Sequence, residues 1–282
     1  MVSGSKYDNK MNFARRVASF LHYMMFAVWH VLRHGKKYDL VLCASGPLVS
    51  IIPARLANLF YCKRYVFEVL DVLPDAAIEA GVLKNPFLKW LSFCLEKMAY
   101  KHASAIVTCS TGMTERVEAK LRKWGWERRV ETIPHGANLG EFELGKEERA
   151  AWRGRGLATP RQTVALYTGA MGLSNAIGDV VATVEATAGD ERIVWWFAGD
   201  GIFAKDLKAL AERLPRVKFW GAVSKEEVAK LYSAADVNVV SFMRAPLFYE
   251  NSPNKFFDGI AAGLPAVFNR TTWLEPWLRE YD

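Results

Sequence analysis

The sequence predicts an α/β protein with two doubly wound parallel sheets, one on each side of a polar joint. From Asp39 onward, short β-branched runs alternate with amphipathic stretches, which is the pattern of strand–helix units. Many of these runs end in glycine-containing turns, as parallel strands that lead into helices do. Because 51% of the 282 residues are apolar and mean hydropathy is near zero, a disordered tail and a collagen-like rod are excluded.

Four strands are predicted in the N-terminal half, each an apolar run that precedes a turn. They are Leu40–Cys43, Arg64–Val69, Ala105–Cys109 and Val130–Ile133. The residues between them predict a helix with Pro47 in its first turn, a long helix over Phe87–Tyr100, and a helix over Met113–Lys123 that Ser110 or Thr111 caps.

Residues 140–162 are polar and glycine-rich, with little apolar periodicity. We assign 146–162 as the joint, which leaves one domain over 1–145 and another over 163–282. In the second domain the predicted strands are Val164–Tyr167, Ile193–Ala198, Val217–Trp220, Val237–Ser241 and Ala266–Phe268. The helices between them cover Ala176–Ala188, the stretch up to Arg213, Ser224 to Ala234, and Pro253–Ala262. Parallel sheets bind ligands beyond the carboxyl ends of their strands, so a ligand cleft between the domains is expected.

The net charge of +7 is concentrated at one end of the chain. Residues 1–37 hold seven basic side chains and one acid, and the remainder holds 30 basic against 29 acidic residues. Within residues 11–37 an apolar stripe recurs at helical spacing: Phe13, Val17, Phe20, Met24, Val28 and Val31. Two interpretations remain open, a core helix with solvated ends and a helix lying on an anionic membrane surface. Nucleic acid is not an expected partner, because the basic excess is confined to this segment.

Other features point to a reduced, cytoplasmic protein. No stretch reaches the ~18 apolar residues that a spanning helix needs, and the first twelve residues are too polar for a signal peptide. The four cysteines lie far apart, in neither paired metal-site spacing nor a disulfide framework.

The stretch from Glu250 to Gly263 carries the clearest chemistry. Ser252 is a favoured N-cap and Pro253 a favoured first residue, so a helix is expected to begin here, just beyond a strand. Helix N-termini attract anions, and Lys255 adds a full positive charge where helix stability alone favours an acid. Asp258 lies one turn beyond Asn254 and can accept hydrogen bonds from a diol such as ribose. This pattern favours a phosphate-bearing nucleotide.

Residues 163–268 resemble the donor half of the GT-B glycosyltransferases, specifically the retaining family 4. The likeness rests on Glu250 and Asp258 followed by Ala261-Ala262-Gly263, and on Phe197–Gly201, Phe219–Val223 and Ala235–Val237. The N-terminal half is similar to a WbuB-like branch that builds surface polysaccharides, through Tyr38–Val41, Ser45–Pro47, Phe67–Asp75, Gly81–Leu83 and Ile133–Asn138.

This resemblance implies two Rossmann-like domains, the first on the acceptor side and incomplete, the second on the nucleotide-sugar side. It implies transfer of a sugar from a nucleoside diphosphate sugar, chiefly a UDP-sugar, to a lipid-linked or polysaccharide acceptor. Glu250 would hold the donor sugar, and Asp71 is either a sugar or acceptor contact or a solvated turn residue. The donor-binding set would be Lys255, Asp258, Ser252, Asn254, Gly169, Gly172, Gly199, Gly201, Gly221 and Val223. His135 is expected to be a joint residue.

The sequence departs from the family in two ways. The loop Gly169–Asn175 lacks the Arg and Lys that usually hold the diphosphate. The first strands of the N-terminal domain and a C-terminal helical segment have no counterpart, which implies truncation at both ends. Separately, no DxD metal motif is visible, so no metal or cofactor is expected. A non-catalytic, membrane-associated protein of the same fold and a sugar-nucleotide 2-epimerase are the alternatives.

Overall fold

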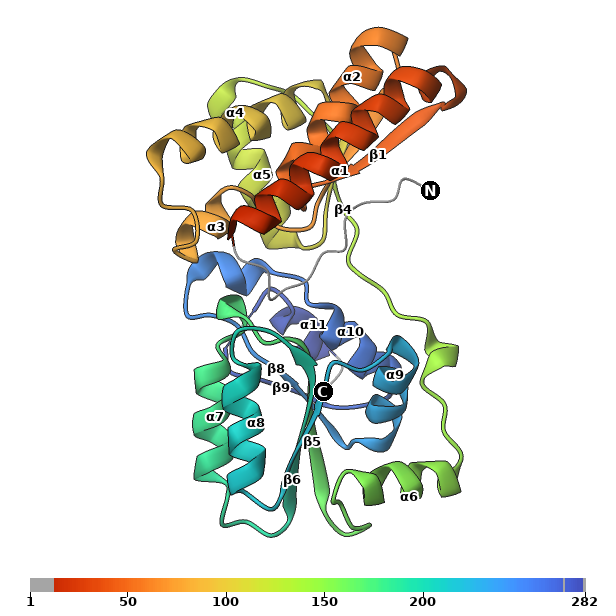
Figure 1. Cartoon of the computed structure of the whole chain (residues 1–282), viewed down its shortest axis with the longest axis vertical. Helices are drawn as coiled ribbons and strands as arrows, with labels where there is room; N and C mark the ends of the chain where they lie inside the picture. The colour runs from red at the N-terminus through yellow and green to blue at the C-terminus, as the bar shows by residue number, and fades with distance from the viewer. Residues whose placement is uncertain (1–12, 271, 281–282) are drawn as a thin grey trace. The chain divides into compact units, whose positions relative to one another are not determined.

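The computed structural model describes residues 13–270 and 272–280 and divides the chain into two compact units (Figure 1). Unit 1 holds the described residues up to Pro134 together with Ala245–Ser252. Unit 2 holds His135–Arg244 and the described residues from Pro253 onward. The basic residues Lys6 and Lys10 and the first part of the predicted N-terminal helix lie outside the described residues.

Unit 1 is built on a parallel sheet whose strand order follows the chain, β1-β2-β3-β4. The strands are β1 (Leu40–Ala44), β2 (Arg64–Val69), β3 (Ala105–Thr108) and β4 (Val130–Thr132). The helices are α1 (Phe13–His34), α2 (Ile51–Tyr61), α3 (Asp75–Glu79), α4 (Pro86–His102) and α5 (Thr111–Trp124). Short 3-10 helices lie at η1 (Gly35–Lys37), η2 (Leu48–Ser50) and η5 (Pro246–Glu250). Pro47 precedes η2, so α2 begins later than the sequence predicted.

Successive right-handed crossovers in one direction place helices on a single face of such a sheet. The core lies on that face, where Cys43, Phe67 and Ile106 share one row of the register. On the opposite face Leu40 and Leu42 of the edge strand β1 are exposed. Leu247 packs into the unit 1 core, which is why Ala245–Ser252 belongs to this unit.

Unit 2 has the doubly wound strand order β7-β6-β5-β8-β9, all parallel. The strands are β5 (Thr163–Ala170), β6 (Ile193–Asp200), β7 (Val217–Gly221), β8 (Val237–Val240) and β9 (Ala266–Phe268). The helices are α6 (Lys146–Arg155), α7 (Ile177–Ala186), α8 (Ala204–Arg213), α9 (Lys225–Ala234), α10 (Asn254–Ala261) and α11 (Glu275–Glu280), with 3-10 helices η3 (Leu139–Glu141) and η4 (Leu173–Asn175).

Side chains alternate between the two faces of the unit 2 sheet. Trp195 and Phe197 pack with α7 and α8, whereas Trp196 packs with Trp152 of α6 and with α9. Figure 1 shows α7 and α8 on one side of the sheet and α6 and α9 on the other. Because the direction of strand succession reverses at β5 and β8, the carboxyl ends of these two strands form the switch point at which such sheets bind ligands.

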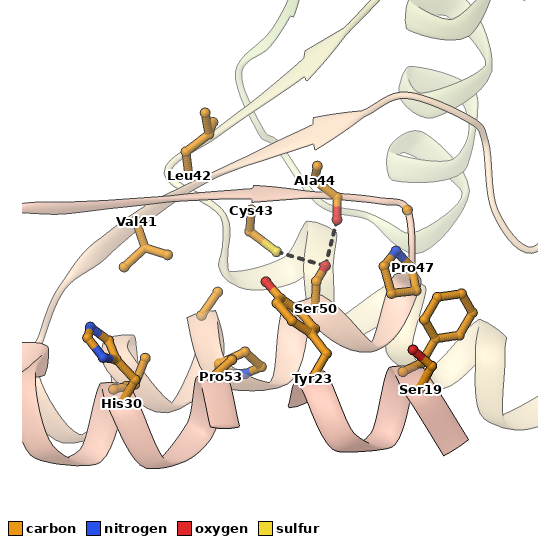
Figure 2. A pocket seen from close by; sticks show the side chains of 15 residues that line it. Ser19, Tyr23, His30, Val41, Leu42, Cys43, Ala44, Pro47, Ser50 and Pro53 are labelled. Atoms are coloured by element: carbon orange, nitrogen blue, oxygen red, sulfur yellow. Dashed lines mark hydrogen bonds between the residues drawn. The ribbon is translucent and has the colours of Figure 1, made fainter. Parts of the chain in front are cut away.

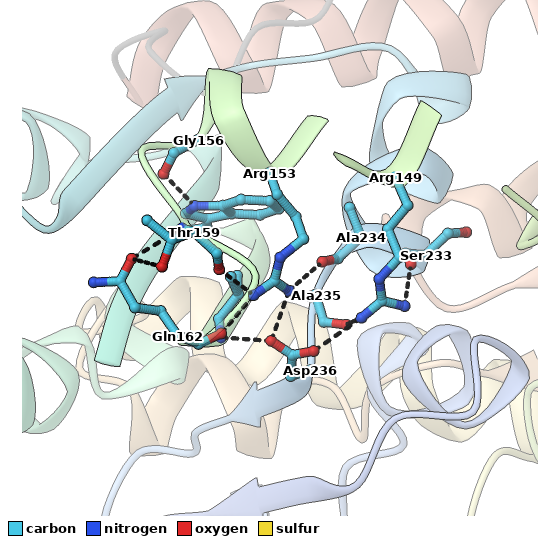
Figure 3. Close-up of polar contacts among 11 residues, drawn as sticks. Arg149, Arg153, Gly156, Thr159, Gln162, Ser233, Ala234, Ala235 and Asp236 are labelled. Carbon is cyan, nitrogen blue, oxygen red and sulfur yellow. Dashed lines mark hydrogen bonds and ion pairs between the residues drawn. The ribbon is translucent and has the colours of Figure 1, made fainter. Parts of the chain in front are cut away.

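The stretch predicted as the joint instead contains α6, which belongs to unit 2, and the units divide at Pro134. Figure 3 shows how α6 is fastened. Arg153 is buried and donates to the carbonyl of Ala234 and to Asp236 at 2.8 Å, and Arg149 donates to Asp236 at 2.9 Å. Asp236 also accepts from the N–H of Val164 on β5 at 2.8 Å. The sequence analysis missed α6 because one of its buried residues is an arginine. The apolar periodicity of the helix is therefore weak.

Asp236→Ala should destabilise unit 2, because it leaves the Arg153 guanidinium buried without its carboxylate. We expect the free energy of unfolding to fall by about 3 kcal/mol in urea titrations. Glu118→Ala is the control, because its exposed ion pair with Arg122 on α5 should contribute less than about 1 kcal/mol. Equal effects of the two substitutions would contradict this role of Asp236.

Candidate functional site

Lys255 lies at the start of α10, beside the carboxyl ends of β5 and β8. Its Nζ lies 3.8 Å from the centroid of the Tyr167 ring and 3.5 Å from Oδ1 of Asn175. A Cβ placed on Gly169 would lie 3.8 Å from Cε of this lysine, so the β5 terminus runs along the side chain. Within residues 13–270 and 272–280, no carboxylate pairs with Lys255. The site therefore presents a cation whose neighbours are an aromatic face and an amide.

The backbone at Lys255 is held by three residues of unit 2. Its carbonyl accepts from Nδ2 of the fully buried Asn238 at 2.8 Å and from the Tyr232 hydroxyl at 3.1 Å. The Tyr232 hydroxyl in turn lies 2.6 Å from that of Thr168. A Cβ on Gly259 would lie 2.1 Å from Asn238 Nδ2, so α10 approaches β8 this closely only because residue 259 has no side chain.

Burial changes the charge properties of Lys255. Desolvation lowers the pKa of its ammonium to about 7. The N-terminal end of α10 adds the partial positive charge of the helix dipole and free N–H groups. An anion bound here would relieve both effects.

The glycines named from the sequence lie at strand ends. A Cβ on Gly199, where φ is +148°, would lie 1.9 Å from the Gly169 carbonyl oxygen, so the ends of β5 and β6 are packed backbone to backbone. Gly201 meets the Met171 carbonyl in the same way. These close approaches supply a structural reason for both glycines. Elsewhere, Gly172 precedes η4, Gly221 ends β7, and Val223 packs partly buried on the unit 2 core.

Asp258 lies one turn into α10 and is half-buried. Burial raises the pKa of its carboxyl, nearby Glu141 raises it further, and Lys225 lowers it. Within the part of the chain that the structure describes, its oxygens have no hydrogen-bond partner. They are free to accept from a ligand. Asn254, the first residue of α10, is exposed.

The start of α10 differs from the sequence prediction. Pro253 occupies the N-cap position and the helix begins at Asn254, so Ser252 does not cap it. Pro253 has an extended backbone, which moves the helix start one residue past the serine. The hydroxyl of Ser252 is buried and has no hydrogen-bond partner among the residues that the structure describes.

Glu250 and Asp71 belong to unit 1. The Glu250 carboxylate pairs with Arg116 of α5 through two hydrogen bonds, Nε to Oε2 at 2.8 Å and Nη2 to Oε1 at 2.6 Å. Asp71 follows β2, and its carbonyl accepts from the Ser45 hydroxyl at 3.1 Å. The Asp71 side chain reaches solvent, yet the surrounding protein still desolvates its carboxyl and raises the pKa to about 6.

Sequence reasoning missed the residues that hold the candidate groups. Arg116, Tyr167, Tyr232 and Asn238 act through contacts with residues far away in the chain. In the sequence, Arg116 looks like an ordinary charge on an amphipathic helix, and no local pattern marks it.

His135, which the sequence analysis expected to be a joint residue, packs against Phe257 within unit 2.

The described residues of unit 1 form apolar cavities that the sequence did not predict, and two of them stand out. One of about 560 Å³ lies between α1 and β1, where Ser50 bonds Cys43 and the Ala44 carbonyl (Figure 2). Another cavity, of about 700 Å³, is lined by the segment that follows β1, by the segment that follows β2, and by α4. None of the predicted site residues lines either cavity.

The described residues show neither a group of side chains that could bind a metal ion nor a helix that could span a membrane. Among the described residues, no three His, Cys, Asp or Glu side chains are grouped so that they could hold a metal ion. Metal independence therefore stays a prediction of the sequence. No helix within the described ranges combines the length and apolar character that a membrane crossing requires.

Part of the chain matches known glycosyltransferases in sequence. Residues 162–275 match the model of the family described as Glycosyl transferases group 1. The chain is 22% identical over 270 residues to a probable glycosyltransferase, WbjE, of Pseudomonas aeruginosa; the match spans 90% of this chain but only 62% of that protein.

Solved structures show the same fold. The structure of Anabaena HepE in complex with UDP and glucose has a TM-score of 0.67 and 16% identity, covering 95% of this chain and 67% of that one. Sucrose-phosphate synthase from Thermosynechococcus elongatus has a TM-score of 0.68 and 19% identity, covering 94% and 64%. The chain has the α/β fold of the GT-B glycosyltransferases, as the sequence predicted.

Lys255→Met should stabilise the protein, most strongly at low pH. Below pH 7 the wild-type lysine is charged in both states, so its desolvation opposes folding in full. Between pH 7 and 10.5 only the unfolded lysine holds the proton, so this opposition fades as pH rises. Urea titrations should show the variant more stable by on the order of 3 kcal/mol at pH 6, with the gap closing toward pH 10. If the difference in stability between Lys255→Met and wild type did not change with pH, desolvation of the Lys255 ammonium would be contradicted.

Proposed function

We propose that the protein is a retaining glycosyltransferase that uses a nucleoside diphosphate sugar, chiefly a UDP-sugar, and a lipid-linked or saccharide acceptor. One observation carries the proposal: a desolvated lysine without a carboxylate partner stands at a helix N-terminus, at the switch point of a parallel sheet. The match of residues 162–275 to a glycosyltransferase family model supports it, because that range contains Lys255 and Asp258.

In the proposed mechanism, the diphosphate binds at the α10 N-terminus and Lys255. The bond between the anomeric carbon and the β-phosphate oxygen breaks while the acceptor oxygen bonds to that carbon. The departing phosphate takes up the acceptor proton. Lys255 and the helix dipole stabilise the negative charge that develops on the leaving diphosphate.

The remaining roles follow from position. Asp258 accepts hydrogen bonds from the ribose hydroxyls, and the base lies near Gly221 and Val223. Glu250 holds hydroxyls of the donor sugar. Asp71 contacts the sugar or the acceptor. The Ser252 hydroxyl, which is buried without a hydrogen-bond partner in the described ranges, donates to the diphosphate.

Lys255→Ala should weaken UDP binding roughly ten- to a hundredfold, because a charge-assisted hydrogen bond contributes ~1.5–3 kcal/mol. The affinity of the wild type for UDP should fall as pH rises above about 7, where Lys255 loses its proton. Calorimetry with UDP and release of UDP or GDP from a panel of UDP- and GDP-sugars are the measurements.

Lys208→Ala, on the exposed surface of α8, is the control and should leave both measurements unchanged. An unaltered UDP affinity in Lys255→Ala removes this lysine from the site. Product identity distinguishes transfer from epimerisation, and a panel without any turnover would favour the non-catalytic alternative.

We also propose that α1 attaches the protein to an anionic membrane surface. The stripe noticed in the sequence is half-buried where it is described (Phe20, Met24, Val28 and Val31), as the core-helix interpretation expects. A second stripe is exposed at helical spacing: Leu21, Met25, Trp29 and Leu32. Exposed Lys36 and Lys37 follow it, and Arg33 lies over the Trp29 ring. An apolar face beside cations suits an interfacial helix.

A Met25→Ser, Trp29→Ser double variant should lower the fraction bound to vesicles of anionic phospholipid about tenfold at low salt, because two side chains lose their apolar contact with the bilayer. Sedimentation with vesicles measures this. Val267→Ser, at an exposed position in unit 2, is the matched control. If the wild type does not sediment with the vesicles at low salt, the attachment is refuted.

A further inference from the structure

Three residues at the start of α5 contact Glu250, and each contacts a different part of it. The Ser110 hydroxyl donates to the Glu250 carbonyl while accepting from the Met113 N–H at 3.1 Å, so one side chain caps α5 and binds Glu250. Gly112 faces the Glu250 side chain: a Cβ at 112 would lie 2.6 Å from its Cγ. Arg116, one turn further along, takes both carboxylate oxygens.

The segment that carries Glu250 is also anchored by apolar burial. Leu247 and Phe248 of η5 are 2% and 3% exposed, and Leu247 belongs to the unit 1 core. The backbone, the methylene groups and the carboxylate of Glu250 are therefore all fixed within unit 1. If these contacts served only to hold η5 in place, burial of Leu247 and Phe248 would suffice. The bidentate hydrogen bonds from Arg116 would then not be needed.

Glu250 nevertheless keeps capacity for a ligand. Its side chain is 23% exposed. An ionised carboxylate has about four acceptor positions, of which Arg116 occupies two. Only three residues separate Glu250 from α10, so its Cα stays within ~14 Å of the helix start at Asn254 by chain length alone.

We propose that Ser110, Gly112 and Arg116 form a seat that positions the Glu250 carboxylate to accept hydroxyls of the donor sugar. They are positioning residues, because they act through Glu250 and not on the substrate. Arg116 fixes the plane of the carboxylate, and the absent side chain at 112 leaves room for the Glu250 methylenes. The inference rests on the proposed function and adds residues on α5 to it.

Gly112→Ala is the sharpest test, because alanine is the stronger helix former and α5 itself is not weakened. The added methyl displaces the Glu250 side chain from Arg116. We expect the melting temperature of Gly112→Ala to be no lower than that of the wild type. Its UDP dissociation constant should stay within twofold of the wild-type value, because Lys255 and Asp258 are untouched. Cleavage of the UDP-sugar that the wild type turns over fastest, in a panel including UDP-glucose, should fall at least tenfold.

Matched variants separate positioning from folding. Arg116→Ala should reproduce the loss, and Arg116→Lys should recover only part of it, since lysine cannot bind both oxygens in a fixed plane. Arg122→Ala, on the same helix and paired only with exposed Glu118, should behave as wild type. In a Glu250→Gln background, adding Gly112→Ala should lower the rate of UDP-sugar cleavage by less than a further twofold, because the carboxylate to be positioned is already gone.

Two failures remain distinguishable. A wild type that neither binds UDP nor cleaves any sugar nucleotide overturns the proposed function, and the seat with it. Intact UDP binding with unchanged cleavage in both Gly112→Ala and Arg116→Ala overturns the seat alone and leaves α5 as a fastening for η5.

Discussion

The close approach of α10 to β8 is the contact on which the unit 2 site depends. Asn238 is buried, and its amide donates to the Lys255 carbonyl at a point where Gly259 leaves no side chain between helix and strand. Tyr232 and Thr168 extend this hydrogen bonding toward β5. The first turn of α10 is therefore fixed from the sheet side, and Lys255 is carried over the Tyr167 ring by packing that has no contact with a ligand.

This arrangement opposes local stability. A cation in the first turn of a helix meets the positive end of the dipole, and burial without a carboxylate adds a desolvation penalty. By contrast, Arg153 is buried but is neutralised by Asp236 and also donates to backbone carbonyls. These two basic groups of unit 2 thus differ: Arg153 pairs with a carboxylate of its own unit, whereas Lys255 has no carboxylate partner among the described residues.

Local sequence patterns predicted the strands and the positions of most helices, because those depend on neighbours in the chain. Arg64–Val69 and Ala266–Phe268 were predicted with the bounds that the structure has, and Ser110 caps α5. The residue types of the candidate site were visible too, since helix stability alone favours an acid where the sequence has Lys255. The partners were not visible: Arg116 meets a residue 134 positions away, and α6 is buried through an arginine that resembles surface charge.

The candidate residues Glu250 and Lys255, five positions apart, are fixed by different units. Glu250 is held by α5 and by the apolar anchors of η5, whereas Lys255 is held by β8 and α9. The connection between Glu250 and α10 consists of Asn251, Ser252 and Pro253, so the extended length of these residues limits the distance between Glu250 and Lys255. The spacing of the motif then reflects chain length as much as helix periodicity.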